Sequence, residues 1–83
     1  MSEKRIGVIG IVIEDRLSAP DVNRILHDHS DMIIGRMGLP YREKNISVIS
    51  LIVDGDTDQL GSLTGKLGAL PHVIVKSALA KLK

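Results

Sequence analysis

Several kinds of residue are scarce in this chain, and each absence narrows what the protein can be. The 83 residues contain no cysteine, which excludes disulfide bridges, thiolate metal sites and catalysis by a thiol. The only aromatic side chain is that of Tyr41, so a stacking platform for nucleic acid bases is missing. Eleven basic residues nearly balance ten acidic ones, and a net charge of +1 gives no electrostatic signature of a polyanion partner. Direct binding to nucleic acid is therefore not expected.

Long hydrophobic runs are also absent. No apolar stretch approaches the length that spans a membrane, and the first residues, MSEKR, lack the pattern of a signal peptide. We expect a cytoplasmic protein without membrane association. A chain of this size buries only about 60% of its unfolded surface, so residues 1–83 are expected to form a single domain. Because no disulfide can stabilise so small a core, oligomerisation is the expected additional source of stability.

The chain repeats itself at an offset of forty residues. The segment IGVIGIVIED at 6–15 lies over ISVISLIVDG at 46–55, with aliphatic residues matched to aliphatic residues. Further along, DMIIGRMG and PHVIVKSA match at the same offset, which places Arg36 over Lys76. Each half is therefore expected to form a strand, a helix and a second strand.

Helix start signals separate the strands in both halves. Ser18 comes two residues before Pro20, and Asp56 comes three residues before Gln59, spacings typical of capped helix N-termini. Apolar residues then recur at helical spacing, and Pro71 ends the second helix. With the polar turn LPYREKN between the second and third strands, the order becomes βαββαβ. This predicts an α+β, ferredoxin-like fold, in which two helices cover one face of a four-stranded antiparallel sheet.

The two repeated strands are apolar on both faces. In 6–13 and 46–53, aliphatic side chains occupy both alternating sets of positions, although two helices can cover only one face. About six aliphatic side chains would then face water in a monomer. Full burial of each one in an interface would contribute roughly 1.5 to 3 kcal/mol of free energy. We therefore expect a homo-oligomer, with a dimer favoured and a tetramer next.

The stretch GSLTGKLG at 61–68 is similar to a phosphate-binding loop but departs from it in three ways. Such a loop needs four residues between its first glycine and its Gly-Lys pair, and a Ser or Thr after the pair. It must also lie between a strand and a helix. Here three residues precede the pair, a leucine follows it, and the stretch lies inside a leucine pattern of helical spacing. Gly61, Gly65 and Gly68 are instead interpreted as a strip that lets the helix approach a neighbouring backbone closely.

Candidate metal ligands fail on their spacing. The sequence DGDTD begins like a calcium loop, but its sixth and twelfth positions are Gln59 and Gly65 instead of glycine and glutamate. His27 and His29 are two residues apart, so on a helix they point to different sides, and His72 stands alone. No spacing singles out a nucleophile with its base and orienting group. We expect no metal, no cofactor and no enzymatic activity.

Two longer segments point to a family. IIGRMGLPYREKNISVISLIVDG and DQLGSLTGKLGALPHVIVKSALAK resemble the iron-only hydrogenase system regulators, over nearly the whole chain. That family is ACT-like in fold and similar to the C-terminal sensor domain of the nickel-responsive repressor, which assembles as a tetramer. The resemblance implies a small sensor-type regulatory module of the hydrogenase system. The residues leave open a structural or protein-binding oligomerisation module that has no small-molecule ligand.

The chain departs from the nickel-responsive repressor in two respects. The repressor's sensor uses histidines and a cysteine around its second and third strands, whereas 33–53 contains neither, which excludes that nickel site. Only MSEKR precedes the first strand, so we expect no DNA-binding segment. A partner protein would have to contact DNA if this protein regulates transcription.

The resemblance also implies a place for a ligand. ACT-like domains commonly bind ligands where the loop after the first strand meets a neighbouring subunit, and here that loop precedes a helix N-terminus that favours anions. Arg36 and Lys76 are expected on the sheet face opposite the helices, since a charged side chain is seldom buried under a helix. We therefore expect a pocket for a small anionic ligand at a subunit interface. Its residues would be Asp15, Arg16, Leu17 and Ser18 of one subunit and Arg36, Met37, Gly38 and Tyr41 of a neighbour.

Overall fold

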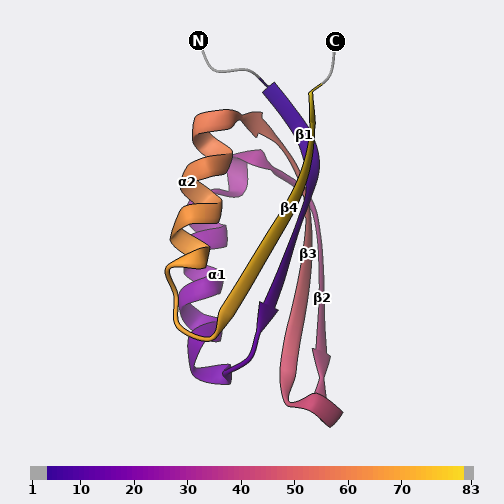
Figure 1. Ribbon diagram of the computed structural model, residues 1–83, viewed down its shortest axis with the longest axis vertical. Helices are drawn as coiled ribbons and strands as arrows, with labels where there is room; N and C mark the ends of the chain where they lie inside the picture. Colours follow the sequence, from indigo (N-terminus) through magenta and orange to yellow (C-terminus); the bar gives the residue numbers. More distant parts are fainter. Residues whose placement is uncertain (1–3, 82–83) are drawn as a thin grey trace.

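A computed structural model describes residues 4–81, which form four strands and two helices in the order βαββαβ (Figure 1). The elements are β1 (Lys4–Ile13), α1 (Ala19–Asp28), β2 (Ile33–Tyr41), β3 (Ile46–Asp56), α2 (Thr57–Gly68) and β4 (Val73–Lys81). Short 3₁₀ turns lie between them: η1 (Arg16–Ser18), η2 (Ser30–Met32) and η3 (Arg42–Lys44). The predicted ferredoxin-like order is confirmed. Neither helix of this described part is long and apolar enough to cross a membrane.

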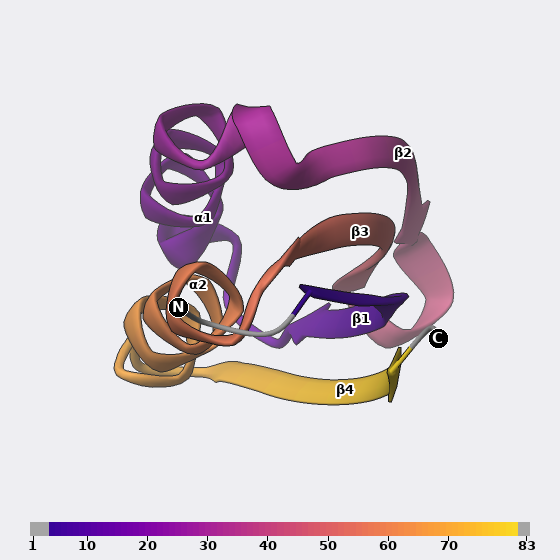
Figure 2. The same ribbon diagram turned by 90° about the horizontal axis from the view of Figure 1, so that it is seen from above.

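The four strands form one antiparallel sheet in the order β2-β3-β1-β4. Both helices lie on the same side of this sheet (Figure 2). The repeated strands β1 and β3 are central, as predicted, and they pair along their lengths, with Ile9 opposite Leu51. The edges of the sheet are β2 and β4.

The core fills the space between the helices and the sheet. It contains only aliphatic side chains and one methionine: Ile9, Ile11, Ile13, Val22, Ile25, Leu26, Met32, Ile49, Leu51, Val53, Leu60, Leu63 and Leu67. Because side chains alternate along a strand, the odd-numbered residues of β1 and β3 face the helices. The even-numbered aliphatic residues of the same strands lie on the opposite face.

The start of α2 is closed by a capping box. The Asp56 carboxylate accepts a hydrogen bond of 2.7 Å from the backbone N–H of Gln59, and the Gln59 side-chain oxygen accepts one of 3.0 Å from the backbone N–H of Asp56. Two N–H groups that the helix leaves without partners are satisfied in this way. The predicted cap of the second helix is confirmed.

The start of α1 differs from the prediction. Ser18 stands at the N-cap position, but its side chain makes no capping hydrogen bond. Its hydroxyl donates instead to the carbonyl oxygen of Pro71, in the loop before β4, at 2.8 Å. The serine therefore connects two loops, and Pro20 and Asp21 in the first turn are the remaining local helix start signals.

The glycines of α2 do not provide close packing within the chain. Gly61, Gly65 and Gly68 are exposed, and a Cβ added at any of them would meet no atom within 4 Å. The interpretation of a packing strip is therefore wrong for this chain. Close approach occurs at Gly7, where a Cβ would collide with the carbonyl oxygen of Ala78 and lie 2.8 Å from the Cα of the next residue.

Candidate functional site

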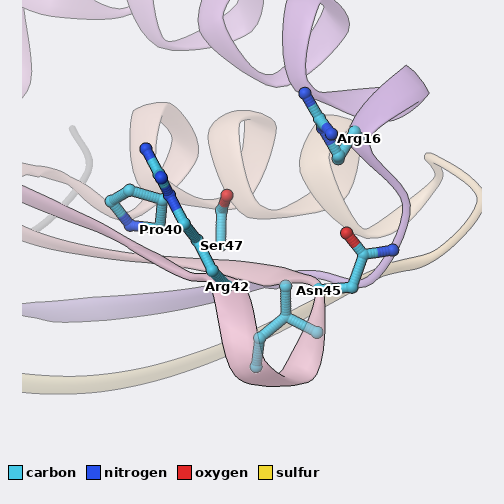
Figure 3. A pocket seen from close by; sticks show the side chains of 6 residues that line it. Arg16, Pro40, Arg42, Asn45 and Ser47 are labelled. Atoms are coloured by element: carbon cyan, nitrogen blue, oxygen red, sulfur yellow. The ribbon is translucent and has the colours of Figure 1, made fainter.

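A pocket lies between the loop that follows β1 and the turn that joins β2 to β3 (Figure 3). Its volume is about 460 Å³, within the range of small-molecule sites. The lining residues are Arg16, Pro40, Arg42, Asn45, Ile46 and Ser47, and we call this site the arginine pocket. Figure 3 shows Arg16 on one side of the pocket and the hairpin residues on the other.

Local hydrogen bonds hold the loop that carries Arg16. The Asp15 carboxylate accepts a hydrogen bond of 2.9 Å from the backbone N–H of Leu17, which closes the first turn of η1. The backbone N–H of Ser18 donates to the Asp15 carbonyl oxygen at 3.0 Å, and the Ser18 hydroxyl holds Pro71. Hydrogen bonds therefore fix this loop internally and also connect it to the loop before β4.

The hairpin side of the pocket is shaped by a left-handed residue. Asn45 has φ 55° and ψ 38°, a conformation that asparagine adopts more readily than most residues other than glycine. Its backbone N–H donates to the Arg42 carbonyl oxygen at 3.1 Å, which closes η3. Pro40 then stands opposite Ser47 on the paired strands, so both reach the same side of the sheet.

Arg36 lies on the helix side of the sheet, contrary to the prediction. It pairs with Leu51, whose side chain is fully buried under the helices, and its guanidinium donates to the side-chain oxygen of Asn23 on α1. The edge position of β2 lets the charged end remain exposed while it reaches the helix. Lys76 pairs with Gly10 on the opposite face, as predicted.

A β-bulge explains why the two repeat-related cations face opposite ways. Ile33 pairs with Val53, but Gly35 already pairs with Ile52, so β2 contains one extra residue at this point. Because side chains alternate along a strand, one extra residue exchanges the faces of every residue that follows it. The matching part of β4 has no such shift.

The face of the sheet opposite the helices is mainly apolar, and we call it the open face. It consists of the even-numbered residues from Ile6 to Val12 and from Ile46 to Ile52, with Met37, Leu39 and Tyr41 of β2 and Ile74, Lys76 and Ala78 of β4. A groove of about 350 Å³ on this face is lined by Met37, Leu39, Tyr41, Val48 and Ser50. The polar side-chain groups of this lining are the hydroxyls of Tyr41 and Ser50.

The eight residues predicted for a ligand site do not meet in one place within the chain. Met37 and Tyr41 line the groove on the open face, whereas Arg36 lies on the helix side. Gly38 pairs with the buried Ile49, so it also belongs to the helix side. Of the loop after β1, only Arg16 lines the arginine pocket. The other three loop residues divide as follows: the Asp15 side chain caps η1, Leu17 is exposed and Ser18 is buried.

Sequence reasoning missed Arg42, Asn45 and Ser47. The signal that could have found them is the end of the polar turn, where an asparagine follows three charged residues. Asparagine at such a place indicates a left-handed turn residue, which folds the start of the turn back over the next strand.

A third pocket, of about 350 Å³, lies between the end of α1 and the start of α2. It contains His29 and three aspartates, Asp28, Asp31 and Asp58. One ring nitrogen of His29 lies 2.8 Å from the carbonyl oxygen of Ile25, so the ring is held by its own helix. Within residues 4–81, no group of three or more His, Cys, Asp or Glu side chains is close enough to hold a metal ion.

Similarity to solved structures defines the class of fold. The ACT domain of GTP pyrophosphokinase from Chlorobium tepidum is 22% identical, with a TM-score of 0.69, over 90% of this chain and 86% of that one. CPII from Thiomonas intermedia K12, a nitrogen regulatory PII-like protein solved with ADP, AMP and acetate, is 13% identical, with a TM-score of 0.53, over 94% of this chain and 90% of that one. The chain is thus an ACT-like member of the ferredoxin-like folds.

The family is narrower than the fold. Residues 5–77 match the TM1266-like family model, described as "Iron-only hydrogenase system regulator, putative", and the chain belongs to this family. The solved structure of the uncharacterized protein TM1266 from Thermotoga maritima is 44% identical, with a TM-score of 0.89. That similarity covers 95% of this chain and 100% of the Thermotoga chain. Comparison with curated proteins finds no significant match.

Proposed function

We propose that this protein is a sensor-type regulatory module that works as a homo-oligomer, in which a second copy covers the open face. The family description, that of a hydrogenase system regulator, supports the regulatory role. The ACT-like fold is consistent with it, although a fold alone does not determine function. The single observation that carries the proposal is the apolar surface that the helices leave uncovered.

The open face is mainly aliphatic, and the exceptions on its two central strands are Gly10 and Ser50. Val8 and Ile52, on the two central strands, are 45% and 49% exposed, and Ile74 on β4 is 45% exposed. No charged residue occupies the even positions of β1 from Ile6 to Val12 or of β3 from Ile46 to Ile52. Lys76 lies on the edge strand β4. A mainly apolar surface whose charged group lies on an edge strand is typical of a protein interface.

The size of this surface supports a second copy as its partner. Seven large hydrophobic side chains of the open face are exposed: Val8, Met37, Leu39, Tyr41, Val48, Ile52 and Ile74. Completing the burial of these residues in both copies contributes on the order of 1 kcal/mol each, or roughly 14 kcal/mol for the pair. This gross gain is comparable to the cost of association, about 4 to 15 kcal/mol, so face-to-face pairing is feasible.

The residues of β2 that were expected to form one interface pocket lie on two different faces of the sheet. Met37 and Tyr41 lie on the open face, so a second copy would contact them directly. Arg36 and Gly38 lie on the other side of the same strand. A ligand pocket that joins both pairs of residues would require the second copy to pass around the β2 edge.

The test is the mass of the particle in solution. We expect light scattering at micromolar concentration to give at least twice the monomer mass of 9.0 kDa. Ile52→Lys should shift the protein to the monomer while circular dichroism stays unchanged, because Ile52 is half exposed in the single chain. Gly65→Lys, which adds the same charge on the exposed side of α2, should keep the mass of the wild type. A monomeric wild type would refute the proposal, and an oligomer unaffected by Ile52→Lys would rule out pairing through the open face.

A further inference from the structure

The five arginines of the chain divide into two groups by their contacts. Three of them have partners: Arg5 donates to the carbonyl oxygen of Lys4 at 3.3 Å, Arg24 pairs with Asp21 at 3.2 Å, and Arg36 donates to Asn23. Among residues 4–81, the guanidinium groups of Arg16 and Arg42 have no hydrogen-bond or ion-pair partner. These two arginines, which come from different loops, are the two that line the arginine pocket.

We infer that the arginine pocket binds a small anion with at least two anionic oxygens, of the phosphate or carboxylate type. One guanidinium group can donate two parallel hydrogen bonds to two oxygens of the same anion, because its N–H groups lie in a fixed plane. It is also positively charged at all ordinary pH values. The inference deepens the proposed function, because it names the class of ligand that a sensor-type module would bind. It rests on that function only for a regulatory role of the ligand, and not for binding itself.

The other polar groups of the pocket suit an anion as well. The Asn45 amide and the Ser47 hydroxyl can both donate hydrogen bonds, and in the described part of the chain neither side chain has a partner. Among residues 4–81, no acidic residue lines the pocket, so its described lining carries two positive charges. In a concave site these charges are expected to attract an anion more strongly than on an open surface.

The neighbouring acids in the sequence are already engaged elsewhere. The Asp15 carboxylate accepts from the backbone N–H of Leu17 at 2.9 Å. The Glu43 carboxylate accepts from the Tyr41 hydroxyl at 3.3 Å. Neither acid forms an ion pair with Arg16 or Arg42. The two arginines are thus adjacent to acids in sequence but not neutralised by them in the described structure.

Backbone turns fix the two loops that form the sides of the pocket. Less conformational entropy is then lost when a ligand binds. Arg16 begins η1, which the Asp15 side chain caps, and Arg42 begins η3, which the left-handed Asn45 ends. Pro40 and Ile46 provide the apolar part of the lining. The pocket has no aromatic residue, so it favours a compact anion over a ligand held by stacking on a base.

The experiment titrates the full-length, ¹⁵N-labelled protein with pyrophosphate and, separately, with succinate at low ionic strength. We expect saturable shifts of the amide signals of Arg16, Arg42, Asn45 and Ser47. Saturation by pyrophosphate identifies a phosphate site, saturation by succinate a carboxylate site, and either supports the inference. Absence of saturation with both anions up to about 10 mM would overturn it, since that corresponds to less than roughly 3 kcal/mol of binding free energy.

Arginine variants separate a site from general charge attraction. Arg16→Gln and Arg42→Gln should each weaken binding about tenfold, the loss expected for one charged hydrogen-bonding group. Arg24→Gln removes the same charge from the exposed side of α1 and should leave affinity within about twofold. Equal losses in all three variants would show that only net charge matters, and would overturn the site.

Light scattering on the same samples keeps this inference distinguishable from the proposed assembly. Wild-type protein that forms an oligomer but binds neither anion refutes the pocket and leaves the assembly intact. A monomer that binds an anion in a manner dependent on Arg16 refutes the assembly and supports the pocket.

Discussion

The hydroxyl of Ser18 donates a hydrogen bond of 2.8 Å to the carbonyl oxygen of Pro71, and so connects two loops that are 53 residues apart in the sequence. Ser18 is only 6% exposed, although it lies in a loop. Close by, the backbone N–H of Glu14 donates to the carbonyl oxygen of His72 at 2.8 Å. These two bonds fix the loop that carries Arg16 against the loop before β4.

Ser18→Ala should therefore lower the free energy of unfolding by about 1 kcal/mol, because the hydrogen bond is lost and a partly buried carbonyl oxygen is left without its partner. Urea unfolding at a fixed protein concentration measures the change. Ser62→Ala, on the exposed surface of α2, is the control and should stay within about 0.5 kcal/mol. An unchanged stability of Ser18→Ala would mean that water replaces the serine hydroxyl at no cost.

Gly7 and Gly10 of β1 form a matched pair for testing how closely β1 and β4 approach. At Gly7 a Cβ would collide with the Ala78 carbonyl oxygen, whereas at Gly10 the nearest atom, the Lys76 carbonyl oxygen, is 3.9 Å away. Gly7→Ala should lower the free energy of unfolding by about 1 to 3 kcal/mol, since backbone must move to accept the methyl group. Gly10→Ala should cause no loss of stability in the same thermal or urea measurement, because the added methyl group meets only an ordinary contact. A similar loss in both variants would contradict the close approach at Gly7.

The fold was predictable because the signals that determine it are local. The forty-residue repeat places two apolar strands in equivalent positions, and Asp56 with Gln59 forms the capping box that their spacing predicts. The position of Arg36 was not predictable, because the face of a strand residue depends on register. One extra residue between Ile33 and Gly35 reverses the alternation, and nothing in the repeat reveals it.

The candidate site was less accessible to sequence reasoning than the fold. Arg16 was identified from its place before a helix, but its neighbours in the pocket lie about 25 to 30 positions further along the chain. They reach Arg16 only because β3 pairs with β1, which sets Ser47 beside Ile13, three residues before Arg16. Such a meeting depends on the pairing of whole strands and not on the spacing of the site residues.

Replacing a glycine of α2 is expected to raise the free energy of unfolding, in contrast to Ser18→Ala and Gly7→Ala. Gly65 lies inside the helix and is exposed, and a Cβ added there would meet no atom within 4 Å. Gly65→Ala should raise the free energy of unfolding by about 1 kcal/mol, because alanine loses less backbone entropy in a helix. Thermal unfolding followed by circular dichroism measures the gain. A loss of stability instead would indicate that another copy packs closely on this side of α2.

Asn45 allows the shape of the turn to be separated from the chemistry of the pocket. Its φ of 55° suits glycine but strains alanine, by roughly 1 to 2 kcal/mol. Asn45→Gly should therefore keep the free energy of unfolding of the wild type, whereas Asn45→Ala should lower it by about 1 kcal/mol. Urea unfolding of the two variants side by side tests this difference. Equal stabilities would mean that the turn relaxes out of the left-handed conformation when the asparagine is replaced.

Both variants remove the amide that faces the arginine pocket, so their anion affinities should change together even though their stabilities differ. Loss of one neutral hydrogen bond should weaken pyrophosphate binding by about fivefold, less than the loss of either arginine. The NMR titration used for the arginine variants measures this on folded protein, and Asn23→Ala on α1 is a control that removes an amide outside the pocket. If Asn45→Gly binds as tightly as the wild type, the amide shapes the turn and does not contact the anion. If it binds no pyrophosphate at all while remaining folded, Asn45 contributes as much to the pocket as Arg16 or Arg42.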